Sequence, residues 1–179
     1  MLDDLSEIYE VIGNSNKSIQ YKEKANSVKK AIWDNCVYNT EFGWILVCST
    51  DLKGQYQIYD DPPGSLQLLA YLGFCAHDES VYMNTMNYLH SKDYKYSFEG
   101  TNFPTLGCDH FPHPAVFSIV NDMLSYRVLE GRQLILKASM DNGIACESID
   151  ENTGECATGA AFATMAGFLA FAIYTSQVK

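Results

Sequence analysis

Short apolar helical segments alternate with long polar loops along this chain, and that alternation constrains the fold more than any other feature. Strand-like sequence is confined to the run Trp44–Cys48, which is too little for a sandwich or a βαβ unit. Apolar residues recur at helical spacing in six segments, 2–12, 18–36, 66–74, 79–90, about two dozen residues from Pro114, and 160–177. We therefore predict an all-α protein of stacked helical hairpins with short β-like loops, in one domain over residues 1–179.

Several helix ends carry recognisable signals. Residues 13–16, GNSN, predict a break between the first two segments, which then form a hairpin. Gly73 predicts the end of segment 66–74. Asp78 is the expected N-terminal cap of segment 79–90.

The apolar faces predict which side of each helix is buried. In the second helix we expect one face to point inward and the lysines to point outward; the inward residues are Ile19, Ala25, Val28, Ala31 and Ile32. Segment 160–177 alternates Ala and Gly with large apolar residues, which permits close approach to other helices. Its apolar run is too short to span a bilayer, so we expect a buried helix.

Composition and charge limit the classes of partner that this chain could bind. Hydrophobic residues make up 47% of the chain and aromatic residues 13%, which indicates a folded protein. The net charge of −10 repels polyanions, so we expect neither nucleic acid nor an anionic membrane as a partner. Neutral ligands such as oligosaccharides are compatible with this charge.

The cysteines and the start of the chain bear on localisation. No CxxC spacing is present, which excludes zinc-ribbon and thioredoxin-like sites, and isolated Cys in apolar runs suits a reducing compartment. The first ten residues contain neither a basic region nor an apolar stretch of the kind that secretion signals carry. We expect a cytoplasmic protein. The six cysteines are Cys36, Cys48, Cys75, Cys108, Cys146 and Cys156.

One acid stands out as a catalytic candidate. Glu147 lies in the stretch Met140–Asp150, MDNGIACESID, which is rich in Asn, Gly and Ser but flanked by apolar sequence. An acid on a polar loop that emerges from a hydrophobic scaffold is a common setting for a catalytic group. The alternative is that Glu147 is one of many solvated acids.

Further loop acids make glycoside hydrolysis conceivable, because that reaction needs two carboxylates across the sugar. Asp60 and Asp61 precede two prolines that stiffen the backbone, although turn formation by Asp-Pro explains them equally well. Asp109 and Asp150 are also on predicted loops. The sequence does not say which of these carboxylates face one another.

The stretch from Cys108 to His113, CDHFPH, has the residue types of half a metal site. A second cluster of Cys and His is missing, so we predict neither a metal nor another cofactor. His110 and His113 are expected instead to hydrogen-bond a polar ligand. A Cys-His nucleophile has no supporting context here. The aromatic residues of stretch 94–103 could stack on a sugar, or they could pack on the core.

A series of motifs, in order, is similar to blocks of the metal-independent exo-α-1,6-mannosidases of glycoside hydrolase family 125. These motifs are Asp60–Leu66, Leu69–Phe74, Val81–Thr85, Leu89–Ser91, Tyr96–Gly100, Gly107–Pro114 and Met140–Asp150. The resemblance implies a six-hairpin (α/α)6 toroid and hydrolysis with inversion. It implies that Glu147 deprotonates the attacking water and that Asp60, Asp61, Glu99 and His110 lie along the sugar pocket.

The chain also departs from that family pattern. The family's general acid lies upstream of the matched region and has no counterpart here, and the helices number about six rather than a dozen. A His precedes the base in the family, whereas Cys146 does here, and stretch 158–163 replaces an Arg- and Trp-bearing segment. The chain thus resembles the C-terminal half of a glycosidase, and another α-glycoside is an open alternative to mannose.

Taken together, we predict a glycoside hydrolase domain that acts on α-linked oligosaccharides by an inverting two-carboxylate mechanism. If the acid is missing, the isolated chain should be inactive, and a homo-oligomer or a complementing N-terminal half would complete it. The alternative is a non-catalytic carbohydrate-binding or helical interaction module.

Overall fold

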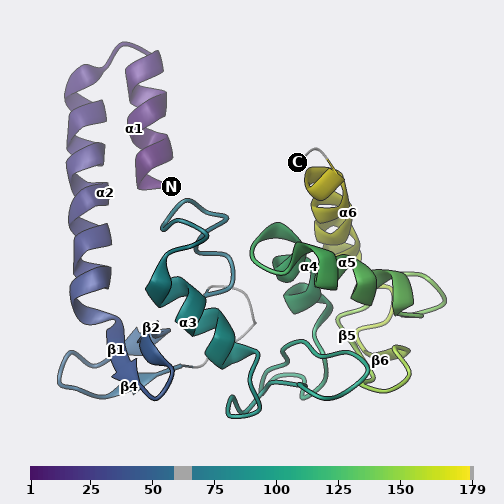
Figure 1. Ribbon diagram of the computed structural model, residues 1–179. Helices are drawn as coiled ribbons and strands as arrows, with labels where there is room; N and C mark the ends of the chain where they lie inside the picture. The colour runs from purple at the N-terminus through teal and green to yellow at the C-terminus, as the bar shows by residue number, and fades with distance from the viewer. Residues whose placement is uncertain (59–65, 178–179) are drawn as a thin grey trace.

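The computed structural model describes residues 1–58 and 66–177 (Figure 1). Within that part of the chain, the helices and few short strands fit the predicted helical, partial toroid-like domain, although a closed ring is not shown. The helices are α1 (Leu2–Val11), α2 (Ser15–Asn35), α3 (Ser80–Leu89), α4 (Val116–Leu124), α5 (Val128–Lys137) and α6 (Ala163–Gln177).

The described strands form three two-stranded antiparallel ribbons. Each joins segments that are close in sequence, so none makes a layer of the fold. The pairs are β1 (Val37–Thr40) with β2 (Gly43–Leu46), β3 (Ser49–Thr50) with β4 (Tyr56–Gln57), and β5 (Ser148–Ile149) with β6 (Cys156–Thr158).

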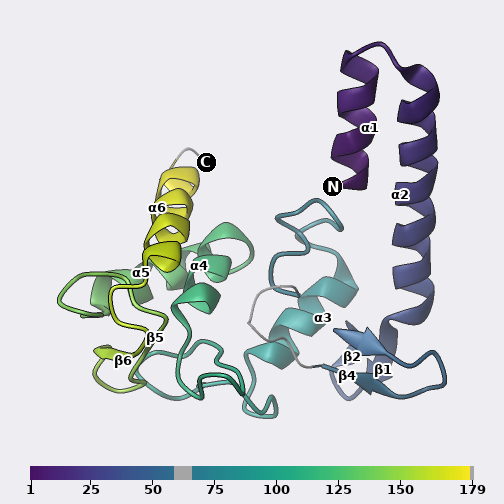
Figure 2. The same ribbon diagram turned by 180° about the vertical axis from the view of Figure 1, so that it is seen from behind.

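Helices α1 and α2 form the predicted hairpin, which rises beside the rest of the molecule (Figures 1 and 2). The buried Ser6 hydroxyl donates to the Ser18 carbonyl at 2.9 Å and joins the two helices. The expected inward face of α2 is buried only in part: Ala25 is buried, but Ile19 is 57% exposed and Val28 is 47% exposed. Helix α2 packs mainly against α1, and only its last turns reach the core around α3, where Ile32 and Trp33 are partly buried.

Two local predictions around α3 need correction. Residues 66–73 form successive turns rather than a regular helix. Gly73 does close them, because its φ of +76° allows Phe74 N–H to donate to the Leu69 carbonyl at 2.9 Å. The cap of α3 is Glu79, whose carboxylate accepts from Tyr82 N–H at 3.0 Å, and not Asp78.

The long helix predicted from Pro114 is wrong, since it divides into α4 and α5 at residues 125–127. Helix α5 folds back against α4 at Gly131. A Cβ there would lie 2.8 Å from Met123 Cγ and 2.9 Å from the Ile119 carbonyl oxygen. Only glycine permits so close an approach.

Helix α6 is buried on one side only, which corrects the prediction of a buried helix. Met165 and Ala172 are fully buried in the core formed with α4, whereas Phe171 is 46% and Tyr174 73% exposed. A Cβ added to Gly167 would meet no described neighbour within 4 Å, so this glycine does not serve close packing. No helix in residues 1–58 or 66–177 has the length and apolarity to cross a bilayer.

Candidate active site

Glu147 lies where β5 meets the start of α4. Its carbonyl accepts from Val116 N–H, the first residue of α4, at 3.0 Å. Its own N–H is shared between the carbonyls of Thr158 and Gly159, each at 3.2 Å. The backbone of this residue is therefore fixed from two directions, by a helix end and by the β6 side of a ribbon.

The Glu147 carboxylate is held through one oxygen. Thr158 Oγ1 donates to Glu147 Oε2 at 2.9 Å, and Ser148 Oγ lies 2.6 Å from Thr158 Oγ1. A hydroxyl has a single hydrogen to donate. Since Thr158 uses it on Glu147, Ser148 must be the donor to Thr158. The two hydroxyls form a relay that orients the carboxylate.

The other carboxylate oxygen faces His110. Glu147 Oε1 lies 4.0 Å from His110 Nε2, which is too long for a direct hydrogen bond. The Glu147 side chain is 22% exposed and the His110 side chain 70% exposed. One oxygen is thus anchored while the other is open to a ligand or water, which is the arrangement that a general base requires.

Gly159 allows this packing. Its φ is +58°, and a Cβ there would lie 2.5 Å from Glu147 Cβ. A side chain at this position would meet both the left-handed backbone and the catalytic candidate. We refer to Glu147, Ser148, Thr158 and His110 as the Glu147 site.

Two other candidate acids are held in the charged form. Hydrogen bonds from Tyr96 and then Lys95 lower the pKa of Asp109 below its ordinary value. Backbone N–H groups of Thr153 and then Asn152 lower the pKa of Asp150. Asp150 accepts from them at 2.8 and 2.9 Å, so its carboxylate closes a turn. A general acid in glycoside hydrolysis needs a raised pKa, so neither carboxylate is suited to that role.

Asp109 also borders a pocket of about 490 Å³ rich in tyrosine. Asp109 directly precedes His110 in the chain, and its carboxylate pairs with Lys95 at 3.2 Å at the edge of this pocket. The predicted aromatic platform is divided, because Tyr94 and Tyr96 line this pocket whereas Phe103 is buried against Gly154. The pocket residues are Tyr56, Gln57, Ile58, Tyr88, Asp93, Tyr94, Lys95, Tyr96 and Asp109.

The remaining predicted site residues lie elsewhere or outside the described chain. Glu99 lines a pocket of about 460 Å³ together with His90 and Arg127. His113 Nδ1 is 3.7 Å from Glu151 Oε2. Asp60 and Asp61 fall in residues 59–65, outside those that the structure describes.

The histidine-rich stretch does not gather metal ligands. Cys108 is fully buried, whereas the His110 side chain is exposed and faces Glu147. In the described ranges, no three His, Cys, Asp or Glu side chains converge on a point that could hold a metal ion.

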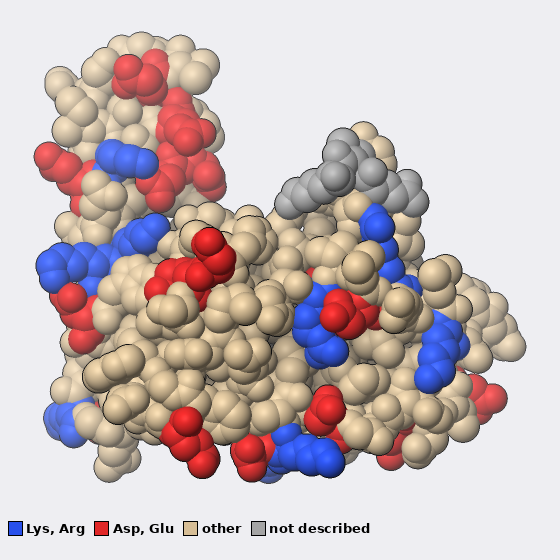
Figure 3. Space-filling model, viewed as in Figure 1, with Lys and Arg blue, Asp and Glu red and all other residues tan. Residues whose placement is uncertain are grey.

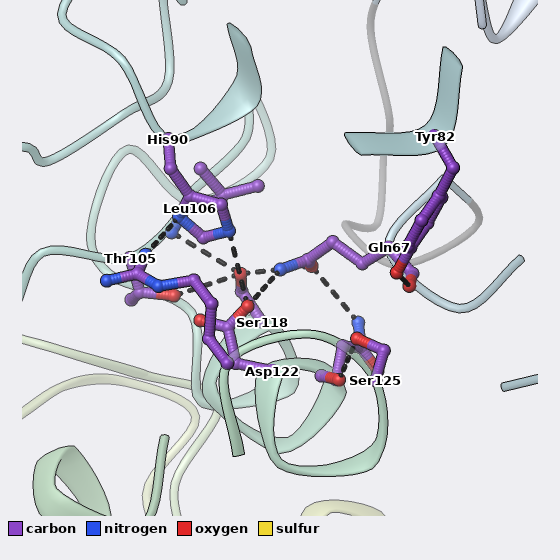
Figure 4. Close-up of polar contacts among 10 residues, drawn as sticks. Gln67, Tyr82, His90, Thr105, Leu106, Ser118, Asp122 and Ser125 are labelled. Atoms are coloured by element: carbon purple, nitrogen blue, oxygen red, sulfur yellow. Dashed lines mark hydrogen bonds and ion pairs between the residues drawn. The ribbon is translucent and has the colours of Figure 1, made fainter. Parts of the chain in front are cut away.

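Sequence reasoning missed a buried polar cluster, which we call the Gln67 network (Figure 4). Gln67 Nε2 donates to Asp122 Oδ1 at 3.0 Å, and Ser118 Oγ donates to Gln67 Oε1 at 3.1 Å. Asp122 Oδ1 also lies 3.2 Å from His90 Nε2, and Arg127 contacts His90 Nδ1 at 2.6 Å. The signal was available, because Asn121-Asp122 interrupts the apolar face of α4. The network also includes Tyr82, Thr105, Asn121 and Ser125.

Figure 3 shows how charged side chains are distributed on one face of the molecule. In Figure 3, acidic side chains gather over the upper part of the α1–α2 hairpin, and the basic ones form no broad patch on that face. The face shown offers no continuous basic surface to a polyanion.

The chain was also compared with known protein families and curated proteins. A family model described as metal-independent alpha-mannosidase (GH125) matches residues 1–173. No curated protein matches the chain. Because the family model spans nearly all of the sequence, the chain belongs to the metal-independent α-mannosidases of glycoside hydrolase family 125.

Proposed function

We propose that this chain provides the general base for hydrolysis of an α-mannoside, with inversion, and that Glu147 is that base. The observation that carries the proposal is the asymmetry of its carboxylate: Oε2 is tied to Thr158, while Oε1 is open toward His110. Family membership supplies the substrate class. We further propose α-1,6 as the linkage, from the sequence resemblance.

In this mechanism Glu147 Oε1 takes a proton from a water as that water attacks the anomeric carbon. Thr158 keeps the carboxylate from rotating, so that its free lone pair stays directed at the water. A positioned base of this kind contributes about two to four orders of magnitude in rate. His110, exposed beside it, is in reach of the water or of a sugar hydroxyl.

The tyrosine-lined pocket supplies a surface for the sugar. Aromatic faces bury the apolar face of a pyranose, and Tyr56 is 39% exposed at the pocket. Lys95 and Asp109 present a donor and an acceptor at the same pocket. A neutral oligosaccharide is the ligand class that such a mixture suits.

The general acid must come from another carboxylate. Asp109 is paired with Lys95 and Asp150 closes a turn with Asn152 and Thr153, so both carboxylates are already engaged by donors that favour the charged form. We propose that the acid is Asp60 or Asp61, or is contributed by a complementing polypeptide. In the second case the chain alone cleaves only substrates whose leaving group needs no protonation.

Two substrates distinguish a general acid within this chain from one that a complementing polypeptide contributes. Dinitrophenyl α-mannoside has a leaving group that departs without an acid, whereas α-1,6-linked mannobiose needs one. We expect the chain to hydrolyse the first, and Glu147→Gln to reduce that rate by about two to four orders of magnitude. Glu155→Gln, an exposed acid beside the same ribbon, is the matched control and should leave the rate unchanged.

The outcomes are distinct. Equal rates for wild type and Glu147→Gln would refute Glu147 as the base. Turnover of mannobiose would place the acid within this chain and direct attention to Asp60 and Asp61. Preference for a glucoside of the same linkage would refute mannose as the substrate.

A second function, carbohydrate binding without catalysis, is favoured by the tyrosine-lined pocket. It predicts that mannose oligosaccharides bind but are not cleaved. Under it, Tyr56→Ala weakens binding while Glu147→Gln does not. Calorimetric titration of both variants distinguishes the two functions.

A further inference from the structure

A polar pocket lies where the C-terminal end of α3 meets the turn between α4 and α5. Its volume of about 460 Å³ is in the range of small-molecule sites. None of its residues belongs to the tyrosine-lined pocket of the proposed reaction, so it calls for a separate account. Its polar side chains are those of Asn87, His90, Glu99, Tyr126, Arg127 and Glu130.

A buried chain of polar groups fixes one wall of this pocket. The His90 side chain is 10% exposed, and the Asp122 side chain behind it is 2% exposed. Arg127 Nη1 lies 2.6 Å from His90 Nδ1. Because a guanidinium only donates, Nδ1 is the acceptor, and the hydrogen of the neutral imidazole is on Nε2. Nε2 lies 3.2 Å from Asp122 Oδ1 (Figure 4), so the core orients His90 and, through it, Arg127.

The charged side chains of the pocket do not pair with one another. Arg127 has five N–H groups, of which the contact with His90 uses one. Within residues 1–58 and 66–177, the exposed carboxylates of Glu99 and Glu130 have neither an ion-pair partner nor a hydrogen-bond partner. The pocket therefore offers oriented donors and free acceptors to a ligand.

The ligand must match donors and acceptors that line the same pocket. A hydroxyl can both donate and accept, so a polyhydroxylated molecule can bind the guanidinium and the carboxylates together. Two carboxylates against one guanidinium disfavour an anion, and Arg127 disfavours a small cation. The ring of Tyr126, which is 38% exposed, offers a face to the apolar side of a pyranose. These features together describe a site for a neutral sugar.

We propose that this pocket is a second saccharide site, which binds a neutral oligosaccharide without cleaving it. Glu147 holds Val116, the first residue of α4. The pocket lies instead at the other end of that helix, where Tyr126 and Arg127 follow it. At 1.5 Å per residue, the nine residues of α4 place its two ends about 12 Å apart. A sugar in this pocket is therefore beyond the hydrogen-bonding reach of Glu147.

The test is hydrogen–deuterium exchange of the whole chain in the presence of α-1,6-linked thiomannobiose, whose sulfur bridge resists hydrolysis. Family membership gives the choice of a mannoside, whereas the site itself does not require Glu147 to be the base. We expect the sugar to slow exchange in the peptides that cover residues 84–91 and 124–131. This protection should increase with sugar concentration and saturate.

The variant Glu99→Ala/Glu130→Ala removes both carboxylates. Neither carboxylate holds another described element, so the fold should be retained, which circular dichroism checks. The sugar concentration for half-maximal protection should rise at least about ten-fold, because two charged acceptors for the sugar hydroxyls are lost. Glu23→Ala, which removes an exposed acid of α2, is the matched control and should leave that concentration unchanged.

Three results would overturn the proposal. One is unchanged exchange in both peptides at millimolar sugar. Another is an equal half-maximal concentration for wild type and Glu99→Ala/Glu130→Ala. The third is protection of the same peptides by calcium chloride alone and not by the sugar, which would indicate a cation site.

The same samples test the proposed function separately. Protection of both peptides, with equal rates of dinitrophenyl α-mannoside hydrolysis in wild type and Glu147→Gln, would count against the proposed function alone. A rate that depends on Glu147, without that protection, would count against the second saccharide site alone.

Discussion

Glu147 and Asp122 are both carboxylates near helix α4, but their surroundings differ in kind. Glu147 is 22% exposed, with one oxygen anchored and the other open. The Asp122 side chain is 2% exposed, and one oxygen contacts both Gln67 and His90. This difference separates their roles. Glu147 is open enough to accept a proton from a ligand, whereas Asp122 is enclosed in the Gln67 network and stabilises the fold.

The largest effect on stability should come from the enclosed acid. Asp122→Ala removes the carboxylate that accepts from Gln67 and lies 3.2 Å from His90 Nε2, and so leaves the buried Gln67 amide without that partner. Removing one member of such a buried group costs about 3–5 kcal/mol. Urea unfolding measures this loss in the free energy of unfolding. Asp78→Ala is an exposed control that should change stability by under about 0.5 kcal/mol. Equal losses for the two variants would show that the Gln67 network is not structural.

The same network predicts an alkaline transition. Burial raises the pKa of Tyr82 to about 12, and its hydroxyl donates to the Gln67 carbonyl at 2.8 Å. The unfolded chain ionises this phenol near 10, so folding loses stability as pH rises from about 10 to about 12. The loss amounts to roughly 3 kcal/mol at 1.4 kcal/mol for each pKa unit. In Tyr82→Phe, the loss of folding stability between about pH 10 and about pH 12 should be smaller by that amount. An equal loss in wild type and variant would contradict the prediction.

At the Glu147 site, the largest loss of stability should come from replacing Gly159. Gly159→Ala forces a side chain onto a left-handed backbone and against Glu147 Cβ, at a cost of about 2–3 kcal/mol. Gly143→Ala is the matched control, because its φ is +85° but an added Cβ would meet no described neighbour within 4 Å. The control should lose only the backbone term, about 1–2 kcal/mol. If both variants lose the same stability, Gly159 does not pack on Glu147.

The smallest effect concerns the hydroxyl relay. Thr158→Val removes the donor to Glu147 Oε2 and should lower turnover about ten-fold, which corresponds to the roughly 1.4 kcal/mol of a hydrogen bond to a charged group. Thr158→Ser keeps the hydroxyl and should retain most of the rate. Steady-state kinetics with dinitrophenyl α-mannoside gives both numbers. A rate for Thr158→Val equal to that of wild type would mean that the relay does not position the base.

Helices could be predicted where the apolar periodicity was strong and no tertiary contact broke the helix. Spacing alone located α3 and the α1–α2 hairpin, and Gly73 marked a real stop. The break between α4 and α5 was missed, because the periodic pattern continues through it and Gly131 acts only once the two helices meet. The predicted burial was wrong for parts of α2 and α6, because periodicity identifies an apolar face but not whether another element covers it.

The site was predictable only in part. Glu147 stood out because it lies on a polar loop between apolar segments, whereas only the family resemblance implied that His110 lies along the same pocket. Thr158 and Ser148 could not be found in this way, because β5 and β6 are only two and three residues long and their register leaves no periodic signal. The Gln67 network required residues 55 positions apart to meet.

The most direct test of Glu147 as the base is chemical rescue of Glu147→Ala with azide. Azide attacks the anomeric carbon without deprotonation, so it replaces both the water and the base. We predict that azide restores cleavage of dinitrophenyl α-mannoside, releasing dinitrophenolate and forming β-mannosyl azide, the inverted product. Failure of azide to raise the rate, or formation of the α-azide, would contradict the assignment of Glu147 as the base of an inverting site.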